Sequence, residues 1–140
     1  MFSRYFDGWE VRPDFEKEAI SLWPNWLGEA NLHKLDEVTE NEWAHFNSLL
    51  KLIAEKYEIE LADCDSRSVS KMDDIEKTLC EYEDSMSKDA SQFSKYVIPG
   101  LDCVLTEDWD YTYILWHKNN GAVEALAPLI AEIGLYHFHA

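Results

Sequence analysis

Three histidines near the end of the chain have a spacing that could hold a metal ion. His137 and His139 are separated by one residue, so in a β-strand their imidazoles share one face. His117, at the end of the preceding predicted strand, could supply a third ligand of a zinc-type site. Two histidines at an exposed chain end are more often solvated than bound to a metal. We therefore expect no metal and no other cofactor.

Catalytic residues are not recognisable in the sequence. An enzyme would need a nucleophile beside a base, or two carboxylates with separated pKa values. The 28 Asp and Glu residues show no catalytic spacing, and no glycine-rich phosphate-binding loop is present. The three cysteines are widely spaced and odd in number, which suits buried free thiols better than a secreted disulfide framework. We predict a non-enzyme; the alternative is a small enzyme that uses His117, His137 or His139 with nearby acids.

The stretch 107–113 joins acidic and aromatic side chains. Its acids and rings are Glu107, Asp108 and Asp110 with Trp109, Tyr111 and Tyr113. If the strand begins early, the three rings share one side and two of the acids share the other. Such a surface can hold the arginine and lysine side chains of a basic partner through charge attraction, cation–π contact and desolvation. The alternative is that Tyr111 and Tyr113 line the core face of a sheet while the acids cap a turn.

A second acidic row lies on a helix predicted from Ser70 to about Ser87. Its exposed face is the second candidate surface for a partner, and the carboxylates of that face are Asp73, Asp74, Glu76, Glu81 and Asp84. Carboxylates spaced like phosphates would suit a nucleic-acid mimic. Three lysines interrupt the row, however, and weaken that interpretation.

The net charge of the chain is far from average. With 28 acidic residues against 12 Lys and Arg, the formal charge is −16 at pH 7. A field of this sign repels nucleic acid and anionic membranes and attracts basic partners. The same charge also keeps a small protein soluble, so acidity alone does not establish a binding function.

Length and composition predict a single globular domain over residues 1–140. The chain is 46% hydrophobic and 14% aromatic, which is enough for a substantial core. No stretch approaches the roughly 20 apolar residues that a membrane span requires. The N-terminus lacks a basic region followed by an apolar one, so we predict no signal peptide and a cytoplasmic location.

Hydrophobic spacing predicts an α+β fold. About three N-terminal helices, over residues 13–23, 40–57 and 70–87, are expected to pack on a C-terminal unit with a small antiparallel sheet. That unit is a β-hairpin at 102–116, a helix at 122–133 and a closing strand at 135–138. The best-defined helix begins with a capping box at Thr39 and Glu42. Trp23 and Trp26 are expected to cover an edge of the core, and the alternative is a pair of rings facing a partner.

In size, in acidity and in the stretch 107–113, the chain resembles the small acidic immunity proteins that bacteria make beside their polymorphic or contact-dependent toxins. The resemblance implies a protein that neutralises a toxin domain, often a basic nuclease, by plugging its active site or an adjacent surface. We accordingly expect a monomer or weak dimer that binds a basic protein, and neither nucleic acid nor a membrane. The alternative binding function is nucleic-acid mimicry of the antirestriction or anti-CRISPR type.

Overall fold

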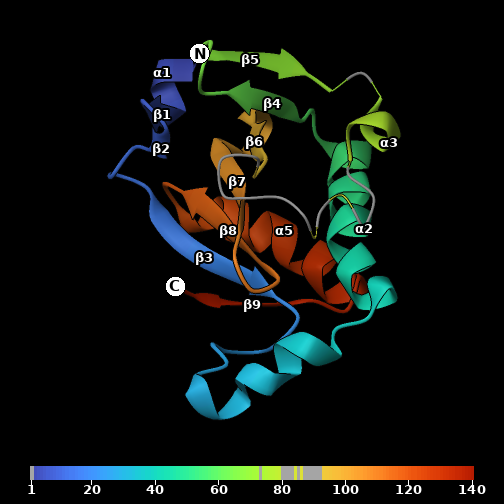
Figure 1. Ribbon diagram of the computed structural model, residues 1–140. Helices are drawn as coiled ribbons and strands as arrows, with labels where there is room; N and C mark the ends of the chain where they lie inside the picture. The colour runs from blue at the N-terminus through green and yellow to red at the C-terminus, as the bar shows by residue number, and fades with distance from the viewer. Residues whose placement is uncertain (1, 73, 80–83, 85, 87–92) are drawn as a thin grey trace.

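A seven-stranded antiparallel sheet forms the centre of the structure, a computed structural model that describes residues 2–72, 74–79, 84, 86 and 93–140 (Figure 1). Its strands are, in spatial order, β5 (Ser68–Lys71), β4 (Glu60–Asp63), β6 (Lys95–Ile98), β7 (Cys103–Asp108), β8 (Thr112–His117), β3 (Glu16–Ser21) and β9 (Tyr136–His139). The mixture of helices with a large antiparallel sheet confirms the predicted α+β class. The sheet is larger than the small one expected.

Two helices, α2 (Glu40–Lys56) and α5 (Asn120–Glu132), pack together and cover one face of this sheet (Figure 1). The predicted capping box begins α2: Glu42 N–H donates to Thr39 Oγ1 over 3.2 Å, and Thr39 N–H donates to Glu42 Oε1 over 3.1 Å. The helix buries Phe46, Leu50 and Ile53 as its spacing predicts, whereas Trp43 is only half-buried.

The N-terminal segment covers part of the opposite face. It consists of α1 (Phe2–Tyr5) and a two-stranded sheet of β1 (Phe6–Asp7) and β2 (Glu10–Val11). Phe2, Phe6 and Phe15 form a second hydrophobic cluster with Val97 and Val104 of the sheet. The sheet is therefore buried on both faces where this segment lies.

The helix predicted over residues 13–23 is wrong, because Glu16–Ser21 form strand β3. This strand lies inside the sheet between β8 and β9, and its last four residues are buried. A strand that is buried on both faces loses the alternating pattern that identifies a strand in a sequence. The helical spacing of a few apolar residues in this segment was therefore a coincidence. Pairing with distant strands determines its structure instead.

The helix predicted over residues 70–87 is corrected at its start. Residues 68–71 form strand β5, and helix α3 covers only Ile75–Thr78. The remainder of the predicted helix lies largely outside the described residues. The described residues also contain two 3₁₀ helices, η1 (Glu29–Glu37) and η3 (Pro99–Leu101).

In chain order the C-terminal region contains the strands β7 and β8, the helix α5 and the strand β9. Gly134, at φ 86°, follows α5 in a left-handed conformation that favours glycine. The unit is not self-contained, however, because β3 lies between β8 and β9. In the part of the chain that the structure describes, no helix has the length and apolarity to cross a membrane.

A polar clamp ties the N-terminal segment to the loop before β7. Asp102 Oδ1 accepts hydrogen bonds from Arg4 Nε over 3.0 Å and from the Tyr5 hydroxyl over 3.1 Å. The hydrogen bond from Arg4 lowers the pKa of Asp102 below its ordinary value of 3.8, against a smaller opposing effect of burial. Burial, followed by the bond to Asp102, raises the pKa of Tyr5 to about 12.

The clamp predicts an acid-dependent contribution to stability. Because the pKa of Asp102 is lower in the folded state, its contribution is present above pH 3.8 and is lost as pH falls through the folded-state pKa. Asp102→Asn, which tolerates the same left-handed backbone at φ 51°, should flatten this part of the acid response. Urea unfolding of both proteins between about pH 2 and pH 5, a range that spans the unfolded-state value and the region below it, measures the difference. Parallel curves would contradict the assignment.

Candidate functional site

The stretch 107–113 forms the end of the β7–β8 hairpin. Asp108 pairs with Thr112, and three residues make the turn between them. Two of these, Asp110 at φ 62° and Tyr111 at φ 55°, have a left-handed backbone, which is uncommon for a bulky tyrosine. The Thr112 hydroxyl donates to the carbonyl of Asp110 over 3.2 Å, and Trp109 N–H donates to Asp108 Oδ1 over 2.8 Å. The turn therefore has a defined conformation.

The turn sends the three rings in different directions. Trp109 is 56% exposed and makes an edge contact with Phe93 at a centroid distance of 4.8 Å. Tyr111 is half-buried, and Tyr113 is buried and stacked on Phe46 at 4.8 Å. The predicted single row of rings is wrong, because β8 begins at Thr112 and the turn breaks the alternation. Tyr113 is a core residue, as the alternative interpretation expected.

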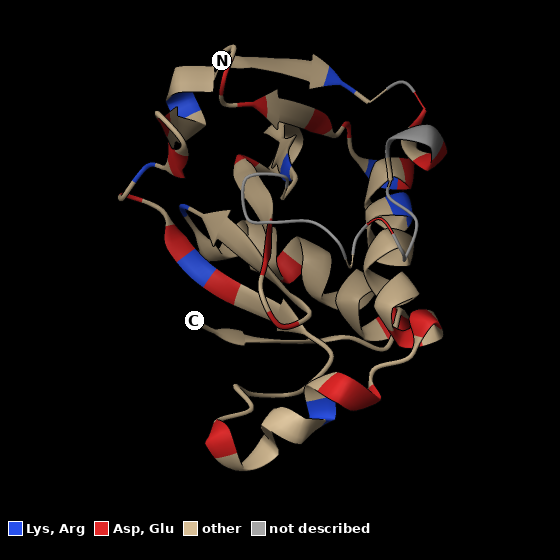
Figure 2. Ribbon diagram, viewed as in Figure 1, with Lys and Arg blue, Asp and Glu red and all other residues tan. Residues whose placement is uncertain are grey.

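The acids of the hairpin have two environments. Asp108 and Asp110 are exposed at its end, where Figure 2 shows acidic residues on the turn. Glu107 is half-buried and accepts a hydrogen bond from Ser94 N–H through Oε1 over 2.8 Å. The exposed pair can act on an approaching charge, while Glu107 also holds the chain before β6.

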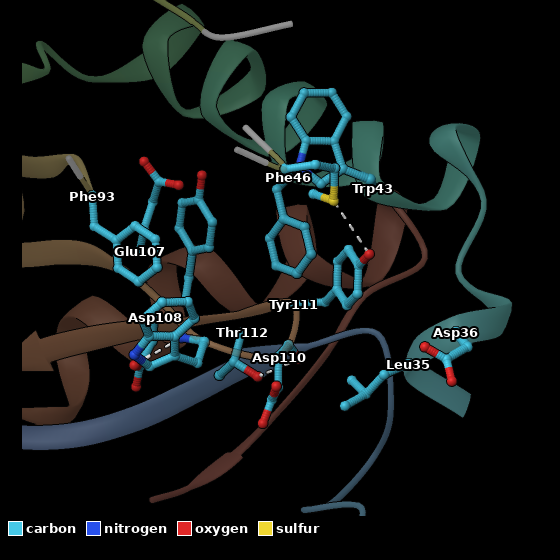
Figure 3. A pocket seen from close by; sticks show the side chains of 13 residues that line it. Leu35, Asp36, Trp43, Phe46, Phe93, Glu107, Asp108, Asp110, Tyr111 and Thr112 are labelled. Atoms are coloured by element: carbon cyan, nitrogen blue, oxygen red, sulfur yellow. Dashed lines mark hydrogen bonds between the residues drawn. The ribbon is translucent and has the colours of Figure 1, made fainter. Parts of the chain in front are cut away.

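A cavity of about 300 Å³ lies between the hairpin end and helix α2. Figure 3 shows Phe93 and Glu107 on one side of it, with Trp43, Phe46 and Tyr111 on the other. The Tyr111 hydroxyl lies 3.5 Å from the sulfur of Met86. Aromatic walls with acidic groups around them suit an apolar or cationic side chain.

A second cavity, of about 220 Å³, lies on the other side of the hairpin end. The loop after β3 brings Trp23 and Trp26 to it, where they meet Trp109, Asp108 and Asp110. Trp26 is 55% exposed, which agrees with the partner-facing alternative for this ring. Sequence reasoning did not place this loop beside the hairpin, because the contact depends on the β3–β8 pairing.

A third, wider hollow of about 560 Å³ lies between the N-terminal segment and the sheet. Trp9, Trp116 and two lysines line it: Lys17 Nζ lies 4.8 Å from the Trp116 ring, and Lys95 Nζ lies 5.8 Å from the Trp9 ring. Asp108 is shared by all three concavities. The hairpin end is therefore the point at which they meet.

The second predicted surface is only partly described. Asp74, Glu76 and Asp84 are exposed, and Glu76 pairs with Lys51 of α2 over 3.7 Å. Asp73 and Glu81 lie outside the described residues. A continuous acidic row on one helix face stays a prediction.

The three histidines do not converge. His117 is buried, with Nδ1 3.0 Å from the carbonyl of Asn119, while His137 Nδ1 lies 2.6 Å from Glu18 Oε2. His139 is exposed. Within the described ranges, no three His, Cys, Asp or Glu side chains are grouped as metal ligands would be.

The two described cysteines are buried. Burial raises the pKa of the Cys64 thiol, and it raises the pKa of Cys103 to about 12, with a further contribution from Asp102. The thiolate is the reactive form of cysteine. Neither thiol is therefore suited to nucleophilic chemistry near neutral pH.

Comparison of the chain with protein-family models, curated proteins and solved structures finds no match.

Proposed function

We propose that this chain is an acidic inhibitor, an immunity protein that neutralises a bacterial toxin by direct binding. Its partner is a basic toxin domain, for which a nuclease is the leading class. The protein acts in the cytoplasm and binds through the end of the β7–β8 hairpin. The inhibitor covers the toxin's active site or a surface beside it.

One observation carries this proposal: Trp109 is 56% exposed between two exposed acids, with cavities on both sides of the hairpin end. A tryptophan in water, at a turn held by local hydrogen bonds, offers a large apolar area to a partner. Asp108 and Asp110 would attract a basic surface toward that ring. The cavities could receive side chains of the partner while the ring contacts its surface.

The net charge of −16 supports the same proposal. A charge of this size raises the encounter rate with a basic protein and depends on salt. Affinity would then come from groups that lose water at the centre of the contact. This division of roles fits the placement of Asp108 and Asp110 on either side of Trp109 at the hairpin end.

The test uses the toxin domain encoded beside this chain, purified and mixed with it. We expect a stoichiometric complex in size-exclusion chromatography and loss of toxin activity at one equivalent of inhibitor. Trp109→Ala should weaken the complex, whereas Trp9→Ala, at an exposed ring outside both cavities that flank the hairpin end, should not.

Two results would contradict the proposal. The first is the absence of both a complex and protection with every neighbouring gene product. The second is stoichiometric capture of a nucleic-acid-binding enzyme in competition with its DNA, which would favour the mimic instead. The mimic has less support, because three lysines interrupt its acidic row and Glu76 of that row pairs with Lys51 of α2 over 3.7 Å.

A further inference from the structure

We propose that the cavity bounded by Trp23, Trp26 and Trp109 is a receptor for a single arginine side chain of the partner. This inference rests on the proposed function, since it names the group that the inhibitor would hold. It assigns a role to the loop 22–28, which lies beside the hairpin end only in the folded protein.

The chemistry of the walls favours a cation. Three indole rings line a space of about 220 Å³, and tryptophan binds cations over its face better than other rings. Among the described residues that line it, the charged side chains are Asp108 and Asp110, both carboxylates. The cavity can therefore offer ring faces and negative charge to the same group.

Two of the rings are held by neighbours outside the cavity. Trp26 makes an edge contact with Phe138 of β9 at a centroid distance of 5.0 Å. Trp23 makes an edge contact with Tyr111 at 6.5 Å. Rings that are already oriented lose less entropy when a ligand enters, so the cavity is prepared for binding.

A guanidinium suits this cavity better than an ammonium. It is planar, it stacks on aromatic faces and it is more weakly hydrated than a lysine ammonium. Its forked donors can reach two carboxylate oxygens together. Asp108 Oδ1 already accepts from Trp109 N–H, which orients that carboxylate beside the ring.

The wider hollow near the N-terminal segment provides a contrast. It also has aromatic walls, but Lys17 and Lys95 lie over its rings. Their ammonium groups occupy the positions that a cation would take and repel a second positive charge. The two aromatic concavities therefore differ: the charged groups of the tryptophan cavity are carboxylates, whereas lysines already lie over the rings of the hollow, whose lining also includes Glu10, Glu107 and Asp108.

The experiment needs no toxin. The indole N–H signals of the whole protein are followed by NMR during titration with N-acetyl-arginine amide, with the neutral citrulline analogue and with N-acetyl-lysine amide. We expect the arginine probe to shift the Trp23, Trp26 and Trp109 signals and to bind roughly tenfold or more tightly than citrulline. The lysine probe should bind more weakly than arginine.

Substitutions of single rings and of the two acids test whether the arginine probe binds in this cavity. Trp26→Ala should lower arginine affinity by roughly tenfold, and because this ring is exposed, the fold should survive its loss. Trp9→Ala removes a ring of similar exposure, 51%, from the lysine-lined hollow and should leave arginine binding unchanged. The double substitution Asp108→Asn with Asp110→Asn should weaken the binding of the arginine probe more than the binding of the citrulline analogue.

Equal affinity for the arginine and citrulline probes would overturn the inference. An equal loss of arginine affinity in Trp26→Ala and Trp9→Ala would overturn it as well. Equal binding of lysine would overturn the assignment to a guanidinium. A toxin complex that forms with unchanged affinity in Trp26→Ala would refute the arginine receptor while leaving the proposed function intact. Arginine binding without formation of any toxin complex would support the arginine receptor and contradict the proposed function.

Discussion

Truncation of Phe46 to alanine should lower the free energy of unfolding by about 3–5 kcal/mol. Phe46 is 2% exposed, and its ring is stacked on Tyr113 with 13° between their planes. The pair joins helix α2 (Glu40–Lys56) to strand β8 (Thr112–His117) beneath the hairpin end. Its removal would leave a cavity, because neighbouring side chains fill such space only in part.

Urea unfolding followed by circular dichroism measures the loss. Lys51→Ala is the matched control on the same helix, since Lys51 is exposed and its pair with Glu76 spans 3.7 Å at the surface. A surface pair of this kind contributes about 0–1 kcal/mol. Similar unfolding midpoints for Phe46→Ala and the control would show that the contact between α2 and the sheet is misassigned.

Helix α2 and the C-terminal hairpin were predictable because their information is local. The capping box at Thr39 and the spacing of Phe46, Leu50 and Ile53 lie within one segment and agree with each other. Gly134 likewise marks the end of α5 (Asn120–Glu132) by its own conformation. Elements of this kind are specified by neighbours in the sequence.

Strand β3 (Glu16–Ser21) could not be predicted in this way. Its partners are β8 and β9, which lie at the other end of the chain, and its pattern of burial does not alternate. Glu18 is buried there, and its Oε2 lies 2.6 Å from His137 Nδ1 of β9, a contact that no local pattern indicates. The helical spacing of a few apolar residues in this segment instead favoured a helix.

The candidate site likewise combines features that the local sequence indicates with features that depend on distant segments. The exposed Trp109 and its flanking acids were visible in the sequence, but the direction of each ring depends on where the turn falls. The cavities depend further on segments that meet only through the sheet, such as the loop carrying Trp26. Pro24 and Gly28 indicate a loop here, but they do not identify the surface that the loop reaches.

Substitutions at the hairpin end should separate attraction from anchoring in the complex with a basic partner. Asp108→Asn with Asp110→Asn should lower the association rate constant by roughly threefold to tenfold, with a smaller rise in the dissociation rate constant from the lost contact to the partner's arginine. Both acids are exposed, so their effect acts through solvent and is screened over about 8–10 Å near physiological ionic strength. The difference in association rate constant between the variant and the parent protein should therefore shrink as salt is added.

Trp109→Ala should instead raise the dissociation rate constant by about thirtyfold, because a desolvated aromatic anchor contributes about 2 kcal/mol or more. Surface plasmon resonance measures both rate constants for each variant. Glu124→Gln with Glu132→Gln is the charge-matched control, since it removes two exposed acids from α5 rather than from the hairpin. An equal loss of association rate in the control would assign attraction to net charge alone. Unchanged dissociation in Trp109→Ala would place the anchor elsewhere, because an exposed ring can be removed without disturbing the core.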